Sequence, residues 1–325
     1  MQPEIKPSIN PKSFTLFLAV LTAVFGLFTV LLSDIFLPIA AALYGVLFLY
    51  EKKKIFSLAL PVLLIGASAF FGYPAVLASV FVFLIGATVA QFYRVGFGKW
   101  ESTIVVTLLF VLYIFLLLFT VAAVGIGSAS LDAVFEFYAK YMETQKAEFV
   151  KALTSVATAL PDGTPVFALT AEEAEALFIS ASRLLVSLAV IIAFCLTGIS
   201  YKLFCGVVRR SDADPVKIGR YTFLPPVPFA YFYILLFFLS LFFSSSESNV
   251  AVALNNLFYI FLVIFAYVGF KFSVFLIRRM RHRGIGIAVF VLFCLFGGVI
   301  AVEALSFFGV FYTVMSRREP PATNR

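Results

Sequence analysis

Apolar residues form nine long runs along the chain, and a polar stretch separates each run from the next. The runs are continuous and lack the alternation of apolar and polar residues that is typical of membrane-barrel strands. Because only helices and closed barrels satisfy their backbone hydrogen bonds in lipid, each run is expected to be a helix. The runs cover residues 14–32, 35–50, 55–71, 74–93, 102–124, 184–203, 228–243, 250–270 and 285–302.

The composition favours the same class of protein. Hydrophobic residues make up 62% of the 325-residue chain and charged residues 13%, with a mean hydropathy of +1.07. Soluble domains contain about 45–50% apolar and 25% charged residues. A helix of about 20 apolar residues is long enough to cross a bilayer. The sequence therefore predicts an all-α, polytopic transmembrane helical bundle of about nine spans, with eight and ten as the limits.

The positions of Lys and Arg predict the orientation of this bundle. Seventeen of the 24 cations lie in the N-terminal tail or in alternate loops: two in the tail, three at 51–54, two at 94–99, five at 202–220 and five at 271–283. Cytoplasmic loops of membrane proteins carry an excess of Lys and Arg. The N-terminus is therefore expected in the cytoplasm. The first run is longer than a signal-peptide core, so we expect it to be retained as a helix.

The last apolar run is compatible with two topologies. A single span over 285–302 would place Arg317 and Arg318 outside, against the charge rule. A break at Gly297-Gly298 would instead make a re-entrant hairpin and return the tail to the cytoplasm. The single span is the favoured expectation.

A long segment, residues 125–182, separates the two groups of apolar runs. It divides the chain into a five-helix membrane region (1–124), an external loop (125–182) and a four-helix membrane region (183–325). Between Asp132 and Glu175 it holds eight acidic residues and three Lys, a net charge of −5. This acidic character agrees with an extracytoplasmic location.

Two helices are expected in this external loop. Apolar residues recur at three- and four-residue steps from Leu131 to Leu160, which predicts an amphipathic helix with Phe135, Met142 and Phe149 on its apolar stripe. Thr170 and Glu173 have the spacing of a capping box, which predicts a second helix that continues into the sixth span. The hairpin is expected to lie on the outer membrane surface or to cap the bundle. The alternative is a lid or docking surface over an outward-facing cavity.

Two short segments share a pattern of small residues at a 20-residue offset. They are Leu64-Ile-Gly-Ala-Ser-Ala69 and Leu84-Ile-Gly-Ala-Thr-Val-Ala90. Small residues let membrane helices approach closely. Both segments are therefore predicted to be helix-packing faces.

Motifs for the common classes of enzyme are missing from the sequence. His282 is the single histidine, which excludes a His-Glu-x-x-His zinc site and argues against a Ser-His-Asp or Cys-His catalytic site. The three cysteines lie in or near apolar runs, where thiols act as small hydrophobes. We therefore expect no catalytic residues, no metal site and no cofactor.

Polar side chains at membrane depth are the remaining candidates for a ligand-binding site, because burying them in lipid is costly. Helix lengths place five of them near the outer face: Arg183, Asn255, Asn256, Glu303 and Asp34. Snorkelling to the interface and hydrogen bonds between helices would explain these residues. The alternative is the mouth of an outward-open ligand site. Arg183 and Glu303 carry opposite charges on different helices and are expected to pair.

The net charge of +7 is concentrated in the cytoplasmic loops. Membrane topology and attraction to anionic lipids explain this, so no nucleic-acid partner is expected. The bilayer is the expected partner. A cytoplasmic protein partner is an open alternative at Arg209, Arg210, Arg278, Arg279, Arg281 and Arg283.

The C-terminal half of the chain resembles a known family. The segments Arg220-Tyr-Thr-Phe-Leu-Pro-Pro, Asn255-Asn256-Leu-Phe-Tyr and Gly309-Val-Phe-Tyr, with Arg317-Arg318, look like those of the YybS-like family of bacterial polytopic membrane proteins. That family is remotely similar to the substrate-binding membrane subunits of energy-coupling-factor vitamin transporters. The resemblance implies small-molecule uptake together with a separate ATPase, and a location in the bacterial cytoplasmic membrane.

Two functions follow as expectations. The first is a transport-related subunit that binds a small solute from the outer side. The second is a non-catalytic membrane scaffold or assembly protein of the cell envelope. An outward-open pocket lined by several polar groups would favour transport, whereas a close-packed bundle with an apolar groove on one side would favour a scaffold.

Overall fold

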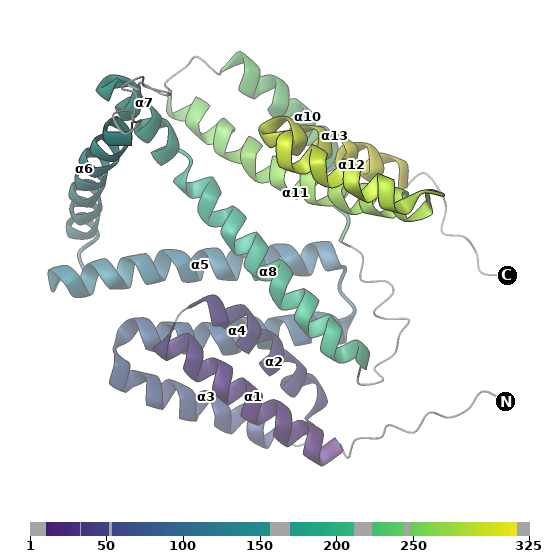
Figure 1. The fold of residues 1–325 in the computed structure, drawn as a ribbon. Coiled ribbons are helices and arrows are strands. Elements are labelled where there is room, and N and C mark those ends of the chain that lie inside the picture. The colour runs from purple at the N-terminus through teal and green to yellow at the C-terminus, as the bar shows by residue number, and fades with distance from the viewer. Residues whose placement is uncertain are drawn as a thin grey trace. The chain divides into compact units, whose positions relative to one another are not determined.

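The computed structural model describes residues 11–32, 34–51, 54–156, 170–210, 223–243 and 248–316. Within these ranges the chain forms twelve α-helices and two short 3-10 turns (Figure 1), so the predicted all-α class is confirmed there. Six helices are long and apolar enough to cross a membrane: α1 (Pro11–Leu31), α4 (Tyr73–Val95), α5 (Lys99–Ile126), α8 (Leu185–Arg210), α11 (Asn249–Arg279) and α13 (Gly298–Ser316).

Four further apolar helices are shorter. They are α2 (Leu37–Tyr50), α3 (Ile55–Ser68), α10 (Val227–Phe242) and α12 (Arg283–Phe296), with 14 or 16 residues each. The 3-10 turns η1 (Asp34–Phe36) and η2 (Ala69–Phe71) extend α2 and α3. At 1.5 Å per residue, 14 to 16 residues span about 21–24 Å, which is less than the ~30 Å hydrocarbon core. Each of the first eight predicted runs coincides with one helix.

The prediction of a single helix over 285–302 is wrong. The structure divides this stretch between α12 and α13 at Gly297–Gly298. Gly298 has a φ of 50°, in the left-handed region that side-chain-bearing residues rarely adopt. The two glycines therefore end one helix and allow the next to begin in a new direction, which is the break that the hairpin alternative required.

The helix before this break, α12, runs antiparallel to α11. Phe290 contacts Phe270, with ring centroids 5.4 Å apart. Gly286 precedes Phe290 by four residues on α12, and it lies beside Ile277, which follows Phe270 by seven residues on α11. The numbering of the two helices therefore runs in opposite directions at their contact.

The helix after the break, α13, runs parallel to α11. Gly309 lies against Gly269. Three residues further along both helices, Tyr312 stacks on Phe272 with ring centroids 4.6 Å apart. The last residue of α13, Ser316, therefore lies toward the C-terminal end of α11 (Figure 1). Arg317 and Arg318 follow directly but lie outside the described residues.

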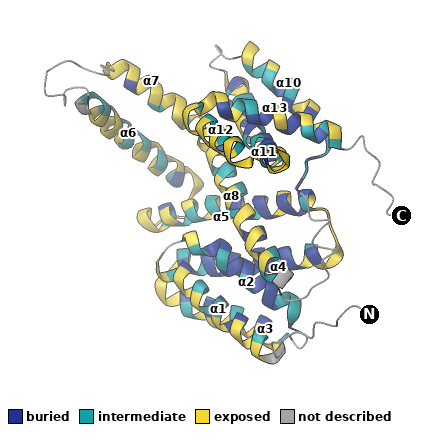
Figure 2. Ribbon diagram, turned by 45° about the vertical axis from the view of Figure 1, so that its right-hand side comes forward, coloured by how far each residue is buried: buried dark blue, intermediate teal, exposed yellow. Residues whose placement is uncertain are grey.

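The helices gather into two compact units. Unit 1 comprises Met1–Ser182 and Ile192–Tyr221, and unit 2 comprises Arg183–Ile191 and Thr222–Arg325. The first turns of α8 thus belong to unit 2, and the remainder belongs to unit 1. The core of unit 1 draws on α1 to α5 and α8. Figure 2 shows α2 and α4 as its most completely buried helices.

In unit 1, α2 and α4 meet at two facing glycines. A Cβ atom at Gly86 would overlap the carbonyl oxygen of Ala41, and one at Gly45 would lie 2.7 Å from the carbonyl oxygen of Gly86. Close contact of this kind requires small residues. The predicted packing face is therefore confirmed at Gly86. In the first segment, Gly66 itself makes no close contact, because a Cβ there would meet no atom within 4 Å, whereas Leu64 and Ser68 of that segment are buried.

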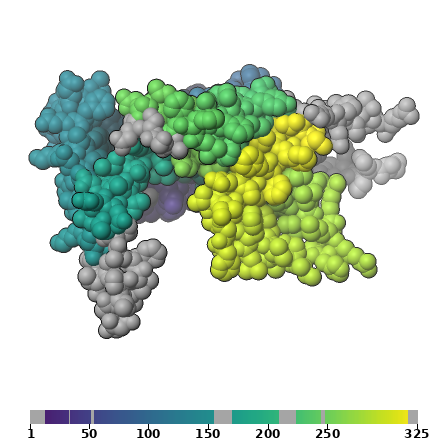
Figure 3. All heavy atoms as spheres, turned by 90° about the horizontal axis from the view of Figure 1, so that it is seen from above, coloured from purple at the N-terminus to yellow at the C-terminus, as the bar shows by residue number. Residues whose placement is uncertain are grey.

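In unit 2, α11 and α13 approach each other just as closely. A Cβ atom at Gly269 would overlap the carbonyl oxygen of Leu305, and one at Gly309 would overlap that of Phe265. Tyr233 of α10 stacks on Phe258 beside this crossing, with ring centroids 5.7 Å apart. Figure 3 shows the side chains of α10 (green) packed against those of α13 (yellow). The crossing therefore forms the centre of unit 2.

The amphipathic helix predicted from residue 131 is present as α6 (Leu131–Val156). Its predicted end at Leu160 and the turn after it lie outside the described residues. The capping box is confirmed: Thr170 N–H donates to Glu173 Oε2 at 2.8 Å, and Glu173 N–H donates to Thr170 Oγ1 at 3.2 Å. The helix that it begins, α7, spans Ala171–Ser182. The predicted continuation into the next span is wrong, because a turn at residues 183–184 separates α7 from α8.

The α6–α7 hairpin is held by a few contacts within unit 1. Phe149 of α6 packs on Phe178 of α7, with ring centroids 5.5 Å apart. Lys146 Nζ donates to Glu175 Oε1 at 2.8 Å, and this hydrogen bond raises the pKa of Lys146. Phe135, by contrast, is 69% exposed. The apolar stripe is therefore only partly covered by α7.

We expect the glycine crossing of unit 2 to be intolerant of even one methyl group. Gly309→Ala should lower the free energy of unfolding by about 1–3 kcal/mol, because the added Cβ must push the two backbones apart. Gly284→Ala is the matched control, since a Cβ at that position in α12 meets no atom within 4 Å. Thermal unfolding in detergent, followed by circular dichroism, measures both. Equal stability of the two variants would contradict the close crossing.

Candidate functional site

Asn256 joins the start of α8 to α11 within unit 2. Its Oδ1 accepts from the Ser187 N–H at 2.9 Å, and its Nδ2 donates to the carbonyl oxygens of Arg183 at 2.8 Å and Val252 at 2.9 Å. The side chain is 8% exposed. Both ends of the amide are therefore used to hold the turn at Arg183 against α11, which is the interhelical role that the sequence left open.

Of the other polar candidates of unit 2, Glu303 lies close to α10. Tyr233 Oη and Ser306 Oγ are 2.7 Å apart and share a hydrogen bond, and the Ser306 hydroxyl also lies 2.6 Å from the carbonyl oxygen of Glu303. The Glu303 carboxylate lies close enough to the Tyr233 hydroxyl for electrostatic interaction. Asn255 is half-buried on α11. A small polar cluster therefore connects α10 with α13.

The fifth candidate, Asp34, belongs to unit 1 and not to this cluster. It lies in the 3-10 turn before α2 and interacts with the hydroxyl of Tyr113 on α5. The expected grouping of Asp34 with the residues of unit 2 stays a prediction. So does the pairing of Arg183, in the turn before α8, with Glu303 on α13.

A buried carboxylate that the sequence did not single out closes the turn between α2 and α3. Glu51 is 6% exposed and accepts from the N–H groups of Phe56 at 2.6 Å and Ser57 at 2.7 Å, and from the Ser57 hydroxyl. Burial alone would raise the pKa of Glu51. The hydrogen bonds from Ser57 and Phe56, together with the nearby Lys54, outweigh burial and hold that pKa below its ordinary value.

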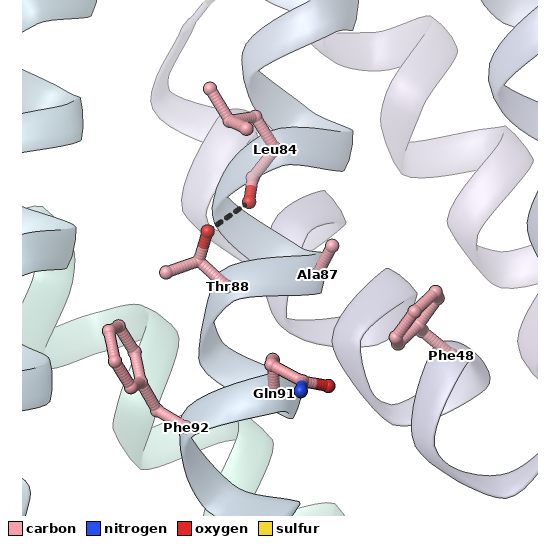
Figure 4. Close-up of a pocket in the computed structure, with 6 residues that line it drawn as sticks. All are labelled: Phe48, Leu84, Ala87, Thr88, Gln91 and Phe92. Atoms are coloured by element: carbon pink, nitrogen blue, oxygen red, sulfur yellow. Dashed lines mark hydrogen bonds between the residues drawn. The ribbon is translucent and has the colours of Figure 1, made fainter. Parts of the chain in front are cut away.

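A shallow hollow of about 360 Å³ lies between α2 and α4 (Figure 4). Phe48 lines it from α2, and the remaining residues come from α4. Apart from Thr88 and Gln91, the lining is apolar. The Thr88 hydroxyl donates to the Leu84 carbonyl oxygen at 2.7 Å, within its own helix. Gln91 is therefore the polar group that this hollow offers to a ligand.

Acidic, His and Cys side chains do not cluster within the described ranges: no group of three or more could hold a metal ion there.

Of the six arginines named for a cytoplasmic partner, Arg278, Arg279, Arg281 and Arg283 are exposed at the α11–α12 turn. Arg279 lies over the ring of Phe275 at 4.3 Å. The side chains of Arg209 and Arg210 lie outside the described residues. The partner itself stays a prediction.

The residues that sequence reasoning missed are polar groups that hold neighbouring segments of the fold together. Glu51 was counted only as part of a charged turn. Ser187 contributes its backbone N–H, and no side-chain pattern signals that role. Tyr233 and Ser306 carry hydroxyl groups on two mainly apolar helices, and that polarity was the one signal that could have identified them.

We expect Asn256→Ala to destabilise unit 2. The substitution leaves the Ser187 N–H and the Arg183 carbonyl without the amide, at a cost of about 1–3 kcal/mol. Asn255→Ala is the neighbouring control and should change stability by less than about 0.5 kcal/mol, as substitutions away from buried networks do. Thermal unfolding in detergent compares the two. Equal losses would show that the Asn256 bonds carry no net stability.

The Glu51 cap predicts a pH dependence. Because the pKa of Glu51 is lower in the folded protein, its contribution to stability is present above the ordinary value of 4.5 and is lost as the pH falls below it. Glu51→Gln, with one acceptor oxygen, should be less stable at neutral pH and should lose less stability on acidification. Glu148→Gln changes an exposed carboxylate of α6 and should leave the pH profile unchanged. Identical profiles for E51Q and the unmodified chain would contradict this role.

Comparison with known proteins identifies the family of this chain. A family model described as "Predicted membrane protein (DUF2232)" matches residues 13–311. No curated protein matches the chain, and no solved structure matches it. The matched range contains all five candidate residues. Because it covers most of the chain, the protein belongs to the DUF2232 family of predicted membrane proteins and is a multi-pass membrane protein.

Proposed function

We propose that the protein is a non-catalytic membrane scaffold that organises an assembly in the cell envelope. The observation that carries this proposal is the use of Asn256, whose amide makes three hydrogen bonds within the fold. An amide that binds a solute must offer its donor and acceptor to that solute. Here both are used to join α8 to α11, which supports a structural role for the outer polar residues.

The α6–α7 hairpin is the surface best suited to a partner. It is the part of the described chain that is both rich in acidic residues and amphipathic, with Asp132, Glu136, Glu143 and Glu148 on α6 and Glu172, Glu173 and Glu175 on α7. Tyr141 is 51% exposed on the same helix. Exposed aromatic residues beside acidic residues favour binding of a basic protein segment. We therefore assign the partner as an extracytoplasmic segment rich in Lys or Arg.

A second candidate function is a transport-related subunit that binds a small solute from the outer side. The Tyr233–Ser306 hydrogen bond and the nearby Glu303 carboxylate favour it, because they place a polar cluster among apolar helices. The resemblance of the C-terminal half to the YybS-like family, and remotely to energy-coupling-factor subunits, agrees with it. In that case a separate ATPase would be the partner.

Photo-crosslinking in cells of the source organism separates the two candidates. A photoreactive amino acid at Tyr141 should yield a covalent adduct with one envelope protein. High salt during irradiation should lower the yield of this adduct, because acidic side chains attract the partner. The same amino acid at Leu112 of α5, an apolar position of similar exposure, is the control and should yield none.

Purification of the whole complex in mild detergent completes this test. Recovery of the crosslinked envelope protein together with the chain would support the scaffold. Recovery of an ATPase, with solute uptake that Glu303→Gln abolishes while the protein stays folded, would replace the scaffold with transport.

A further inference from the structure

A groove of about 740 Å³ runs along unit 2 between α11, α12 and α13. Its walls are apolar for most of their length, and the lining includes Phe272, Leu276, Val289, Phe290, Phe293 and Phe308. No residue of α12 is buried, so this helix covers α11 only loosely. The volume lies within the range of about 300–1,000 Å³ that is typical of sites for small organic ligands.

One end of the groove is cationic. Arg281 and His282 belong to its lining, in the turn that joins α11 to α12. Arg278 and Arg283 flank this turn and are exposed. Arg guanidinium groups bind phosphate through several N–H donors at once. The groove therefore joins an anion-binding end to a long apolar trough.

This cationic end lacks a carboxylate partner within the described part of unit 2. The described residues of the unit, 183–191, 223–243 and 248–316, contain one carboxylate side chain, Glu303. Glu303 lies near the start of α13 and interacts with Tyr233 of α10. The α11–α12 turn lies at the opposite end of α13, because α13 runs parallel to α11. Among the described residues of unit 2, no carboxylate therefore competes with an external anion for the charge at this turn.

The geometry points to a site for one anionic phospholipid of the surrounding membrane. Its phosphate binds at Arg281, with Arg278 and Arg283 beside it, and one acyl chain lies along the trough toward Phe293. A zwitterionic phospholipid supplies the same chain but also carries a cationic group, which these arginines repel. Basic pockets between transmembrane helices recognise anionic headgroups in this way.

The size and chemistry of the groove favour a lipid over a free anion. A soluble phosphate would occupy the arginine end alone and make no contact with the aromatic walls. An acyl chain covers those walls, because the apolar side chains of α11 and α12 line the groove over several turns and Phe308 adds one ring from α13. The two ends of a phospholipid thus match the two ends of the groove.

Binding is measured on the purified full-length chain in detergent. Phosphatidylglycerol and phosphatidylcholine with identical acyl chains are added at equal concentrations, and retained lipid is counted by native mass spectrometry. The expected result is preferential retention of one phosphatidylglycerol molecule per chain, with a higher melting temperature than phosphatidylcholine gives. Equal retention of both lipids would overturn the proposal.

Variants at the two ends of the groove locate the site. Arg281→Ala should weaken phosphatidylglycerol binding about fivefold, the change expected for one cation near an anionic surface, and should leave phosphatidylcholine retention unchanged. Arg94→Ala, which removes an exposed cation of unit 1, is the matched control and should have no effect. Val289→Trp should fill the trough and reduce binding while all the arginines are retained.

Two outcomes separate the remaining occupants, and a third measurement controls for folding. Glycerol phosphate, which lacks acyl chains, should not compete; full competition would reduce the site to a simple anion site and overturn the lipid assignment. A cysteine at Val289 that crosslinks to a second copy of the chain would assign the groove to a dimer contact instead. The melting temperatures of R281A and V289W in phosphatidylcholine show whether the variants fold. If both equal that of the unmodified chain, the variants are folded, and their weaker phosphatidylglycerol binding reports damage to the binding site.

Discussion

Contact between helix backbones at paired glycines is the interaction on which each unit depends. Inside a bilayer, lipid is as apolar as a leucine side chain, so helices gain little by hiding apolar surface from it. Close packing and hydrogen bonds must hold them together instead. Gly45 with Gly86 in unit 1, and Gly269 with Gly309 in unit 2, bring two backbones to a distance that no side chain would allow. The aromatic residues beside each crossing then pack at fixed positions.

The crossing in unit 2 also determines what the polar and exposed surfaces of that unit can do. With α13 held along α11, α12 lies over only part of the pair and leaves the apolar groove open. The same arrangement returns the end of α13 toward the basic turn and keeps Glu303 away from it. Asn256 is meanwhile used to attach the start of α8. The hydrogen bonds of Asn256, which stabilise unit 2, therefore involve other residues than those that line the groove.

Much of the fold could be predicted because lipid limits the backbone to a few solutions. Continuous apolar runs predicted the first eight apolar helices, and the Thr170–Glu173 spacing predicted a cap that is present. The ninth run was mispredicted because hydropathy does not register a helix break between two glycines. The candidate site was harder. Asn256 was found by its polarity. Its partners in α8 and the turn before it are backbone groups of residues 183 and 187, and no pattern of side chains predicts backbone partners. Glu51 was missed because a buried cap and a solvated charge look alike in sequence.

The parallel crossing of α11 and α13 is the claim that most directly tests this account. Cysteines replace Phe272 and Tyr312 in a chain whose three native cysteines are changed to alanine, and a short thiol-specific cross-linker is added in native membranes. The account predicts efficient cross-linking of this pair, because the native rings stack at 4.6 Å. Cysteines at Leu262 and Tyr312, which an antiparallel crossing would bring together, should not cross-link. Cross-linking of the second pair in place of the first would contradict the hairpin and the groove that depends on it.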